Sequence, residues 1–409
     1  MFETVESCRS CGSAELQQFL SLGRMPLTSA LLCPEQLDDV EPTYPLDVAL
    51  CRDCALVQVL GNIPPELIFG GDYPHYSSFS GTLIGHAREH ALRLIRMHGL
   101  DRSSLVIELG SNDGYMLRNF VEHGIPALGI DPAPGPALAA DAAGIPTLRA
   151  FFDHELATRL RDEGRRADVI IANNVLSHVI DPNSFVAGIA MLLKEDGIAT
   201  IKVAYVRHLI RQSAFDTIDH EHLVHYSVTA VQPLLRRHGL FLNRVEEVPS
   251  HGSSLRLYVG RRDESDGSAA MYLDREAREG IASLHFYEGL AARIHAIKDT
   301  LLEILGELKD EGRSIAAYGA ASNGVILLNY IGADGELVDF VVDQNVHMQG
   351  KYLPGVRIPI HDPAEILRQM PAATLMLPWD FKDEILAQQT AYRSRGGRFI
   401  IPIPSPTVV

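Results

Sequence analysis

The feature that most restricts the fold of this chain is an apolar run followed by a glycine-containing turn, within residues 105–131. The run is apolar except for one acid, Glu108, which is typical of a buried parallel strand. Helical spacing and a second apolar run follow the turn. In chain order we expect a strand at 105–109, a turn at 110–114, a helix at 115–123 and a strand at 127–130. This is one strand–turn–helix–strand unit of a nucleotide-binding α/β fold.

The acids of this unit indicate which nucleotide it binds. A dinucleotide site needs the pattern G-x-G-x-x-G to hold a pyrophosphate, and this turn lacks it. Instead Asp113 lies in the turn, Glu108 precedes it and Asp131 ends the second strand. Three carboxylates repel a pyrophosphate but complement the ammonium, sulfonium and ribose hydroxyls of S-adenosylmethionine (SAM). The alternative is a flavodoxin-like domain with an acidic loop and no ligand. The expected cofactor-binding residues are Glu108, Gly110, Asn112, Asp113, Gly114, Asp131 and Asn173.

Two C-x-x-C pairs near the amino terminus predict a metal site. Cys8 and Cys11 form one pair, and Cys51 and Cys54 form the other. Each pair places two thiolates on a tight turn, and two such pairs make a tetrahedral zinc site. Four protein ligands leave no open coordination position, so the expected Zn²⁺ is structural. Two disulfides and four free thiols are the alternatives, and Cys33 lies outside the pattern.

Composition is that of a soluble globular protein. The chain has 409 residues, enough for two or three domains, of which 46% are hydrophobic and 22% charged. A net charge of −16 argues against nucleic acid and against an acidic membrane surface as partners. No apolar run reaches the roughly 18–20 residues of a membrane span, and the amino terminus has no secretion leader. We therefore expect a cytoplasmic protein, as a monomer or a weak homo-oligomer.

The doubly wound pattern continues after Asp131. A strand at 167–172 ends in Asn173, and His178 follows within one turn, at the edge where open α/β sheets bind ligands. This position favours a functional histidine over a helix-capping or buried one. Further elements are expected at 153–161, 181–193 and 229–238 (helices), at 197–203 (strand), and at 240–246 and 254–260 (a hairpin around 250–253).

Two segments carry many polar and reactive side chains. Residues 72–80 are rich in tyrosine, serine and histidine, and would form either a lid over the site or an ordinary surface loop. Residues 219–226 contain three histidines, two acids and a tyrosine. The spacing of His220 and His222 puts both on one face only in a strand, unlike the helical H-E-x-x-H metal site. A general base, His222 held by Glu221 or Asp219, fits better, and a solvated loop is the alternative.

The last third of the chain predicts a second nucleotide-binding-like half. Residues 263–312 have the spacing of linking helices. A strand at 314–318, a turn at 319–324, a helix at 325–331 and a strand at 338–342 ending in Asp343 follow. This turn contains no acid, so its backbone N–H groups can meet phosphate. Trp379 follows another strand tip, where an aromatic ring either stacks on a base or sugar or closes a core.

The order of motifs resembles that of the three-domain sugar C-methyltransferase family, over essentially the whole chain. The motifs are the two C-x-x-C pairs, ELGSNDG, FDTIDHEH, HGSSLRLY, and a C-terminal YGAASNG, VDQN and QGKYLPG. The resemblance implies a zinc-binding domain at 1–70, a class I SAM-binding methyltransferase domain at 71–262, and a helical linker with a Rossmann-like domain that binds the sugar nucleotide at 263–409.

The resemblance also implies the reaction. It is methylation of the carbon alpha to the ketone of a dTDP-4-keto-deoxysugar, at C-3, in antibiotic deoxysugar biosynthesis. His222 is then the base, with Glu221 and Asp219 beside it, while Tyr76 and His178 hold the sugar. The base removes a proton, and the resulting enolate attacks the sulfonium methyl in line. The substrate-binding candidates are Tyr76, His178, His225, Tyr318, Gly319, Ser322, Asn323, Lys351 and Trp379.

Two residues depart from the family pattern. The family usually has a tyrosine where Asp219 stands and a lysine where Asn323 stands. These departures keep an NADPH-dependent 4-ketoreductase, alone or combined with the methyltransferase, as an alternative, although both turns lack G-x-G-x-x-G. A non-catalytic zinc scaffold is a third class, and the acids around His222 count against it because a scaffold needs no base.

Overall fold

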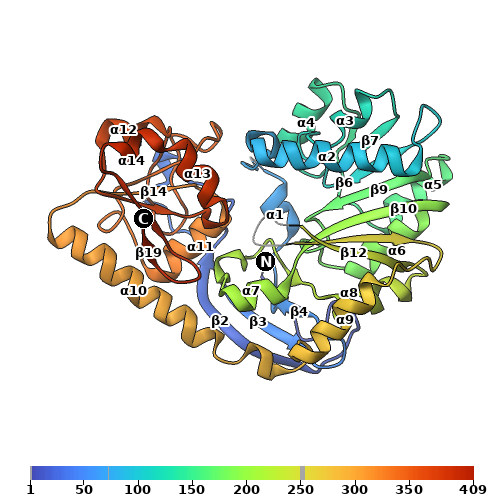
Figure 1. The fold of residues 1–409 in the computed structure, drawn as a ribbon, viewed down its shortest axis with the longest axis horizontal. Helices are drawn as coiled ribbons and strands as arrows, with labels where there is room; N and C mark the ends of the chain where they lie inside the picture. The colour runs from blue at the N-terminus through green and yellow to red at the C-terminus, as the bar shows by residue number, and fades with distance from the viewer. Residues whose placement is uncertain (1, 72, 249–253) are drawn as a thin grey trace.

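Residues 2–71, 73–248 and 254–409 are described by the computed structural model, and they form three main sheets. Figure 1 shows two lobes side by side, with the N-terminal strands and a long helix along the side that joins them. The loop expected at 250–253 lies outside the described residues. Among the helices that the model describes, none is long and apolar enough to cross a membrane.

The N-terminal sheet has four strands in the order β11-β4-β3-β2, and all its pairs are antiparallel. Its edge strand β11 comes from the histidine-rich segment, far away in the sequence. A separate pair joins β1 to β5. The elements of this part are β1 (Glu3–Thr4), β2 (Leu16–Pro26), β3 (Thr43–Cys51), β4 (Val57–Val59), β5 (Gly61–Asn62), α1 (Pro65–Phe69) and β11 (Val224–His225).

A seven-stranded sheet forms the second lobe, in the order β12-β13-β10-β9-β6-β7-β8. The strands from β10 to β8 are parallel, and β13 is antiparallel between β10 and β12, as expected for a class I methyltransferase sheet closed by a hairpin. Both faces are covered by helices, which is why the central strands are continuous apolar runs. The strands are β6 (Val106–Leu109), β7 (Ala127–Ile130), β8 (Thr147–Leu148), β9 (Ala167–Asn173), β10 (Leu193–Ala204), β12 (Phe241–Val248) and β13 (Ser254–Gly260).

The helices around this sheet begin where the sequence places capping residues. Ser80, Asp153, Asp181 and Ser227 each accept a backbone N–H at a helix start. The helix expected at 115–123 is shorter than predicted, because turns with i→i+3 hydrogen bonds replace its first residues. The helices are α2 (Gly81–His98), α3 (Arg118–Val121), α4 (Pro134–Ala142), α5 (His154–Asp162), α6 (Pro182–Leu192), α7 (Val206–Gln212) and α8 (Val228–Arg237).

The other lobe contains a six-stranded sheet in the order β16-β15-β14-β17-β18-β19, parallel except for β19. The linking helices α9 and α10 precede it, and α10 runs along its outer edge (Figure 1), as the spacing at 263–312 predicts. The elements are α9 (Ser268–Glu279), α10 (Leu290–Asp310), β14 (Ile315–Tyr318), α11 (Ser322–Ile331), β15 (Phe340–Val342), β16 (Ile360–His361), α12 (Ala364–Gln369), β17 (Ala373–Met376), α13 (Lys382–Gln388), α14 (Thr390–Ser394), β18 (Arg398–Ile401) and β19 (Thr407–Val408).

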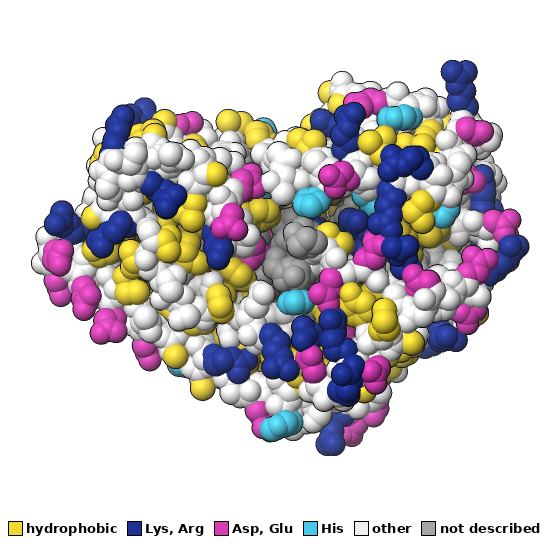
Figure 2. Space-filling model, in the orientation of Figure 1, with side chains coloured by type: hydrophobic (Ala, Val, Ile, Leu, Met, Phe, Trp, Pro, Cys, Tyr) yellow, Lys and Arg dark blue, Asp and Glu magenta, His cyan; other side chains and the backbone are white. Residues whose placement is uncertain are grey.

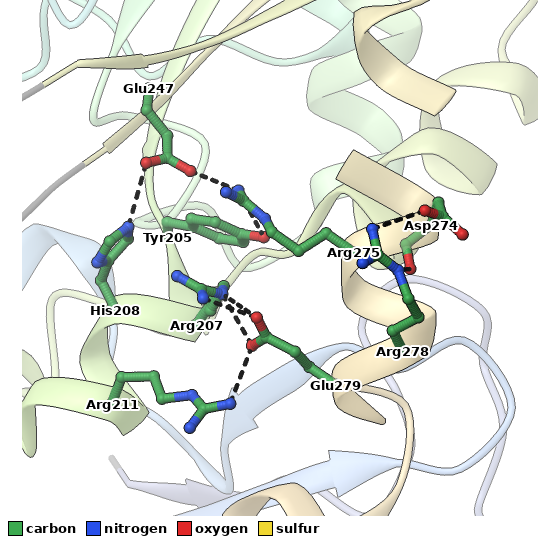
Figure 3. Close-up of polar contacts among 9 residues, drawn as sticks. All are labelled: Tyr205, Arg207, His208, Arg211, Glu247, Asp274, Arg275, Arg278 and Glu279. Carbon is green, nitrogen blue, oxygen red and sulfur yellow. Dashed lines mark hydrogen bonds and ion pairs between the residues drawn. The ribbon is translucent and has the colours of Figure 1, made fainter. Parts of the chain in front are cut away.

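Helix α7 leads into the histidine loop, the name used here for residues 215–226, and an ionic network fixes it to its surroundings. Figure 3 shows Arg207 and Arg211 of α7 converging on Glu279 of α9. The Arg207–Glu279 ion pair has an N–O distance of 2.7 Å. Arg275 of α9 pairs in turn with Glu247 of β12. The network therefore ties the start of the histidine loop to the linking helices and to the sheet hairpin.

Candidate functional site

The four cysteines of the two C-x-x-C pairs meet at one point. Their sulfur atoms all lie within 4.8 Å of one another, with 3.5 Å between Cys8 and Cys54 and 3.6 Å between Cys11 and Cys51. All are free thiols, so the two-disulfide alternative does not hold. Thiolates bound to tetrahedral zinc lie roughly 3.8 Å apart, given a Zn–S bond of about 2.3 Å. The cluster fits a structural Zn²⁺, and no second metal-binding group is found in the described parts of the chain.

The zinc-bearing sheet carries the histidine loop directly. Strand β11 pairs with β4, and Val59 N–H donates to the carbonyl of Leu223 at 2.9 Å. The hydroxyl of Thr28 donates to Glu221 Oε1 at 3.2 Å. The metal site therefore stabilises the surface on which the candidate catalytic side chains are held.

The turn after β6 has the geometry of a nucleotide site. Gly110 and Gly114 have positive φ angles of 64° and 77°, which disfavour other residues. A Cβ atom at these positions would lie 2.3 Å from Val175 and 2.4 Å from Ile145. Asp131, at the tip of β7, accepts the N–H of Asn112 at 2.8 Å, so the second strand fixes the turn after the first.

Buried acidic oxygens next to this turn fit a cationic ligand. Neither carboxylate oxygen of Glu108 makes a hydrogen bond of good geometry with a described residue, and Asp113 Oδ1 is equally without one. Burial raises the pKa of Glu108, and the charges of Asp131 and Asp113 add to this effect, although the Asn173 side chain opposes it. Such carboxylates are costly unless a donor or a cation reaches them. A cationic ligand such as SAM, with its ammonium and sulfonium, would supply that charge.

The polar segment expected as a lid or a loop lies on this turn, and we call residues 73–80 the cover segment. Ser77 N–H donates to Asn112 Oδ1 at 2.9 Å, and Ser78 N–H donates to Asp113 Oδ2 at 3.0 Å. The ring of Tyr76 stacks on His347 of the other lobe, 4.3 Å between centroids. A Cβ at Gly135 would lie 2.4 Å from the Tyr76 hydroxyl. The segment therefore packs on the turn after β6 and touches both lobes, and its role as a lid stays a prediction.

The histidine loop places a carboxylate on the expected base. Asp219 Oδ1 accepts the Nδ1–H of His222 at 3.0 Å and the backbone N–H groups of Glu221 and His222, each at 2.8 Å. Burial by itself lowers the pKa of His222, but the charge and hydrogen bond of Asp219 outweigh it and raise that pKa above its ordinary value. This bond leaves Nε2 of His222 as the nitrogen that can take a proton. Asp219 Oδ2 is buried without a hydrogen-bond partner among the described residues.

Two more histidines surround this pair in neutral form. The rings of His178 and His222 are 4.6 Å apart, edge to face. Burial lowers the pKa of His178 to about 3 and that of His75, in the cover segment, to about 4. The Nε2 atoms of His75 and His178 are buried and find no protein partner in the described residues. The site thus presents neutral imidazoles that a polar ligand can satisfy.

Glu221 and His220 contact different residues. The hydroxyl of Tyr73 donates to Glu221 Oε2 at 3.4 Å, and burial, with the charge of Asp219, raises the pKa of Glu221 to about 7. His220 turns to the N-terminal sheet, where its Nε2 lies 3.2 Å from the carbonyl of Pro45. His225 is buried in strand β11, and burial lowers its pKa to about 3.

The six-stranded sheet repeats the turn geometry with other chemistry. Asp343, after β15, accepts the N–H of Ala320 at 2.7 Å, and burial raises the pKa of its carboxyl group. Helix α11 starts at Ser322 and includes Asn323, and no side chain caps its N-terminus. Gln344 donates to the hydroxyl of Tyr318 at 3.1 Å. The predicted substrate residues of this turn therefore lie together at the carboxyl edge of the sheet.

Two other substrate candidates lie at contacts between lobes. Trp379 is 7% exposed, and its indole N–H donates to Asp216 Oδ2 of the histidine loop at 2.8 Å. This contact corresponds to the core-closing role that the sequence left open. Lys351 lines a cavity of about 270 Å³ whose wall includes Gln36 and Tyr73. The surface is notched between the lobes, with histidine side chains along the boundary (Figure 2).

Sequence reasoning missed three residues that contact the candidate site. Tyr73 and His75 were hidden within a segment predicted only as a lid or a loop. Thr28 belongs to the N-terminal part and has no motif of its own. Its contact with Glu221 joins residues far apart in the sequence. In the sequence alone, Thr28 is only a polar residue before the second C-x-x-C pair.

This chain is similar to known protein families and to individual known proteins. Residues 8–69 match a family model described as a zinc binding domain, residues 84–243 a methyltransferase domain, and residues 249–404 a C-methyltransferase C-terminal domain. The C-methyltransferase NovU of Streptomyces niveus is 32% identical over 408 residues, covering 99% of this chain and 97% of that protein. The ubiquinone biosynthesis O-methyltransferase of Azorhizobium caulinodans is 29% identical over 119 residues, 26% of this chain and 46% of that protein. The SAM-bound magnesium protoporphyrin IX methyltransferase of Synechocystis PCC 6803 is 15% identical, covering 44% of this chain and 82% of that one, with a TM-score of 0.33.

Proposed function

This chain belongs to the family of zinc-binding, SAM-dependent C-methyltransferases, and from that premise we propose that it methylates C-3 of a dTDP-4-keto-deoxysugar, alpha to the ketone, in antibiotic deoxysugar biosynthesis. The observation that carries the proposal is the Asp219–His222 pair, next to neutral imidazoles with unsatisfied nitrogens. Carbon methylation beside a ketone needs such a base, because the proton on that carbon must leave first.

In the proposed mechanism, His222 is the base. Its Nε2 removes the proton from the carbon alpha to the ketone, while its Nδ1–H stays on Asp219. The raised pKa of His222 makes the imidazole a stronger base, and Asp219 stabilises the imidazolium that forms. Bound SAM supplies the electrophilic methyl group.

The neutral imidazoles of His75 and His178 have a separate task. Removal of the proton places negative charge on the ketone oxygen, and an N–H donor there stabilises the enolate. Since burial keeps both rings uncharged, each has one N–H to donate and one nitrogen to accept. The cover segment, which carries His75, also excludes water from the site.

The nucleotide part of the substrate is assigned to the six-stranded sheet. The uncapped start of α11 presents the backbone N–H groups of Ser322 and Asn323, the arrangement that binds phosphate. Asn323 supplies no charge at this turn, so Lys351 is the cation that we propose for the diphosphate. The candidates Tyr76, His225 and Trp379 remain predictions for substrate contact.

Mass spectrometry tests this proposal. A dTDP-4-keto-6-deoxysugar is incubated with the enzyme and with SAM alone, NADPH alone, or both. We expect a gain of one methylene mass with SAM alone and no change with NADPH alone. A gain of two hydrogens that requires NADPH would replace the proposal by the 4-ketoreductase alternative, and both gains would indicate a bifunctional enzyme.

A further inference from the structure

Each of the two large sheets fixes the backbone of one asparagine at its carboxyl edge. In the seven-stranded sheet, Asp131 Oδ2 accepts the backbone N–H of Asn112 at 2.8 Å. In the six-stranded sheet, Asp343 Oδ1 accepts the backbone N–H of Asn345 at 2.7 Å. Asn345 is the last residue of the VDQN motif, and the proposed function gives it no role.

The side chains of both asparagines bind the backbone of His75 in the cover segment. Asn112 Nδ2 donates to the carbonyl of His75 at 3.0 Å. Asn345 Nδ2 donates to the carbonyl of Pro74 at 2.6 Å. The carbonyl of Pro74 belongs to the planar peptide group before the His75 Cα, and the carbonyl of His75 belongs to the one after it. Both peptide groups of His75 are therefore held, one from each lobe.

Asn345 is buried, with 6% exposure, and both ends of its side-chain amide are used. Its Oδ1 accepts the backbone N–H of His347 at 3.0 Å, while its Nδ2 donates to Pro74. The ring of His347 in turn stacks on Tyr76. The six-stranded lobe therefore contacts the cover segment on both sides of His75, at the residue before it and at the residue after it.

The ring of His75 lies against the candidate site. It is edge-on to Tyr73, with 5.2 Å between the ring centroids, and the hydroxyl of Tyr73 donates to Glu221 of the histidine loop. Nε2 of His75 is buried and has no hydrogen-bond partner in the described residues, so it is open to a ligand. A side chain that takes part in catalysis must be held within about 0.5 Å of its productive position. Contacts that fix the His75 backbone therefore bear directly on its imidazole.

We propose that Asn345 is a positioning residue, which holds the backbone of His75 so that the imidazole lies in the candidate site. The six-stranded lobe then completes the site of methyl transfer, besides binding the nucleotide. This inference rests on the proposed function for the role of His75 as a donor to the enolate. The position of the ring, however, can be measured without any substrate.

Nuclear magnetic resonance of the His75 ring tests the inference without turnover. Enzyme with ¹³C-labelled histidine is titrated from neutral to acidic pH, and the spectrum of His75→Gln assigns the resonance. In the wild type, burial lowers the pKa of His75 to about 4, so the ring stays neutral near pH 7. In Asn345→Ala we expect the ring to gain access to water and its pKa to rise toward the ordinary value of about 6.5. Asn345→Leu, which fills a similar volume without an amide, is the second variant if Asn345→Ala does not fold.

Asn329→Ala is the matched control for this titration. The amide of Asn329 also donates to a proline carbonyl, that of Pro354 at 3.0 Å, but this contact lies within the six-stranded lobe. We expect the control to leave the titration of His75 at its wild-type position. An unmoved titration in Asn345→Ala would overturn the proposal even if thermal stability fell. An equal shift in Asn345→Ala and Asn329→Ala would also overturn it, because it would indicate general loosening of the lobe.

A double-mutant cycle then connects the position of the ring to turnover. We expect Asn345→Ala to lower kcat about tenfold in the wild type but less than about twofold in a His75→Ala background, because a misplaced ring and a missing ring act alike. Equal losses in both backgrounds would overturn the link to His75. If no sugar nucleotide is methylated while the titration of His75 shifts as expected, the proposed substrate fails and the positioning role of Asn345 stands.

Discussion

The chain contains two strand–turn–helix–strand units of nearly the same geometry. In the seven-stranded sheet, Gly110 N–H donates to the carbonyl of Ile130 at 2.7 Å, and Asp131 accepts an N–H of the turn. In the six-stranded sheet, Gly319 N–H donates to the carbonyl of Val342 at 2.7 Å, and Asp343 accepts an N–H of the turn. In both, an acid at the tip of the second strand fixes the turn after the first.

The chemistry of the two turns differs where their geometry agrees. The first turn carries Asp113 and lies beside the buried Glu108, so it favours a cation. The second has no acid within residues 319–324 and runs into α11, a ten-residue helix with an uncapped start. The backbone geometry of such a turn therefore does not determine which ligand it binds. Under the proposed function, a few side chains on an otherwise shared backbone geometry make one turn suit SAM and the other suit a phosphate.

The largest effect on turnover is expected in the histidine loop, which lies between the two units in the sequence. This loop supplies the proposed base, and neither unit does. His222→Ala is expected to lower kcat about 10²- to 10⁴-fold, because proton removal loses its base. S-adenosylhomocysteine affinity, measured by calorimetry, stays at the wild-type value. His220→Ala is the matched control, since this neighbour faces Pro45 in the N-terminal sheet and its loss leaves most of the turnover. Retained turnover in His222→Ala would remove the base from the histidine loop.

Substitution of the two strand-tip acids tests most directly whether the two turns bind different ligands. Asp131→Ala and Asp343→Ala each remove an acceptor for two backbone N–H groups, so both should lose stability on the order of 2 kcal/mol. Only Asp131→Ala is expected to weaken SAM binding, by about 10- to 100-fold, because its carboxylate is also the group proposed to hold the ribose hydroxyls. Asp343→Ala should instead raise KM for the sugar nucleotide.

Calorimetry and thermal unfolding of these two variants separate an effect on the fold from an effect on ligand binding. A loss of SAM affinity shared equally by Asp131→Ala and Asp343→Ala would mean that the acids act only through the fold. A loss of SAM affinity confined to Asp343→Ala would exchange the two assignments.

The sequence predicts these units well because their signals are local. Strand β7 and strand β13 have the predicted bounds, and α9 and α10 occupy the region of helical spacing at 263–312. Apolar runs and turn residues determine such elements within about ten residues. The helix at 115–123 was predicted too long, because its spacing is helical but its first turn follows the tight turn at Gly114.

The candidate site was less predictable because its contacts join distant segments. Motifs identify His222 and the cysteines, whose spacing is a local property. Nothing in the sequence shows that β11 completes the zinc-bearing sheet, or that Asn112 and Asp113 bind the cover segment through Ser77 and Ser78. Those contacts depend on how three sheets pack, which no local pattern encodes.

The pH dependence of activity tests whether Asp219 acts on the proposed base, His222. The base must be neutral to act, so activity rises as the pH passes through the pKa of His222, which Asp219 raises above its ordinary value. Asp219→Asn removes that charge and leaves burial, which lowers the pKa. We therefore expect the acidic limb of kcat/KM to move to lower pH, with a plateau rate about tenfold lower. Asp168→Asn, far from the loop, should leave the limb in place, and an unmoved limb in Asp219→Asn would separate Asp219 from the base.

The smallest effect tests whether the two units act together. Trp379 of the six-stranded unit donates to Asp216, three residues before Asp219, and burial raises the pKa of the Asp216 carboxyl group to about 8. Trp379→Phe keeps an aromatic ring but leaves this buried group without its donor, which costs about 1–3 kcal/mol.

If the contact positions the histidine loop, kcat of Trp379→Phe should fall about 3- to 10-fold, while S-adenosylhomocysteine affinity is unchanged. Tyr330→Phe is the control, because its ring packs 5.0 Å from Phe215 of the same loop and keeps that contact without the hydroxyl. Equal effects of both variants would indicate general loosening of the lobe contact. Wild-type kcat in Trp379→Phe, with only thermal stability reduced, would mean that the second unit holds its substrate without helping to position the base.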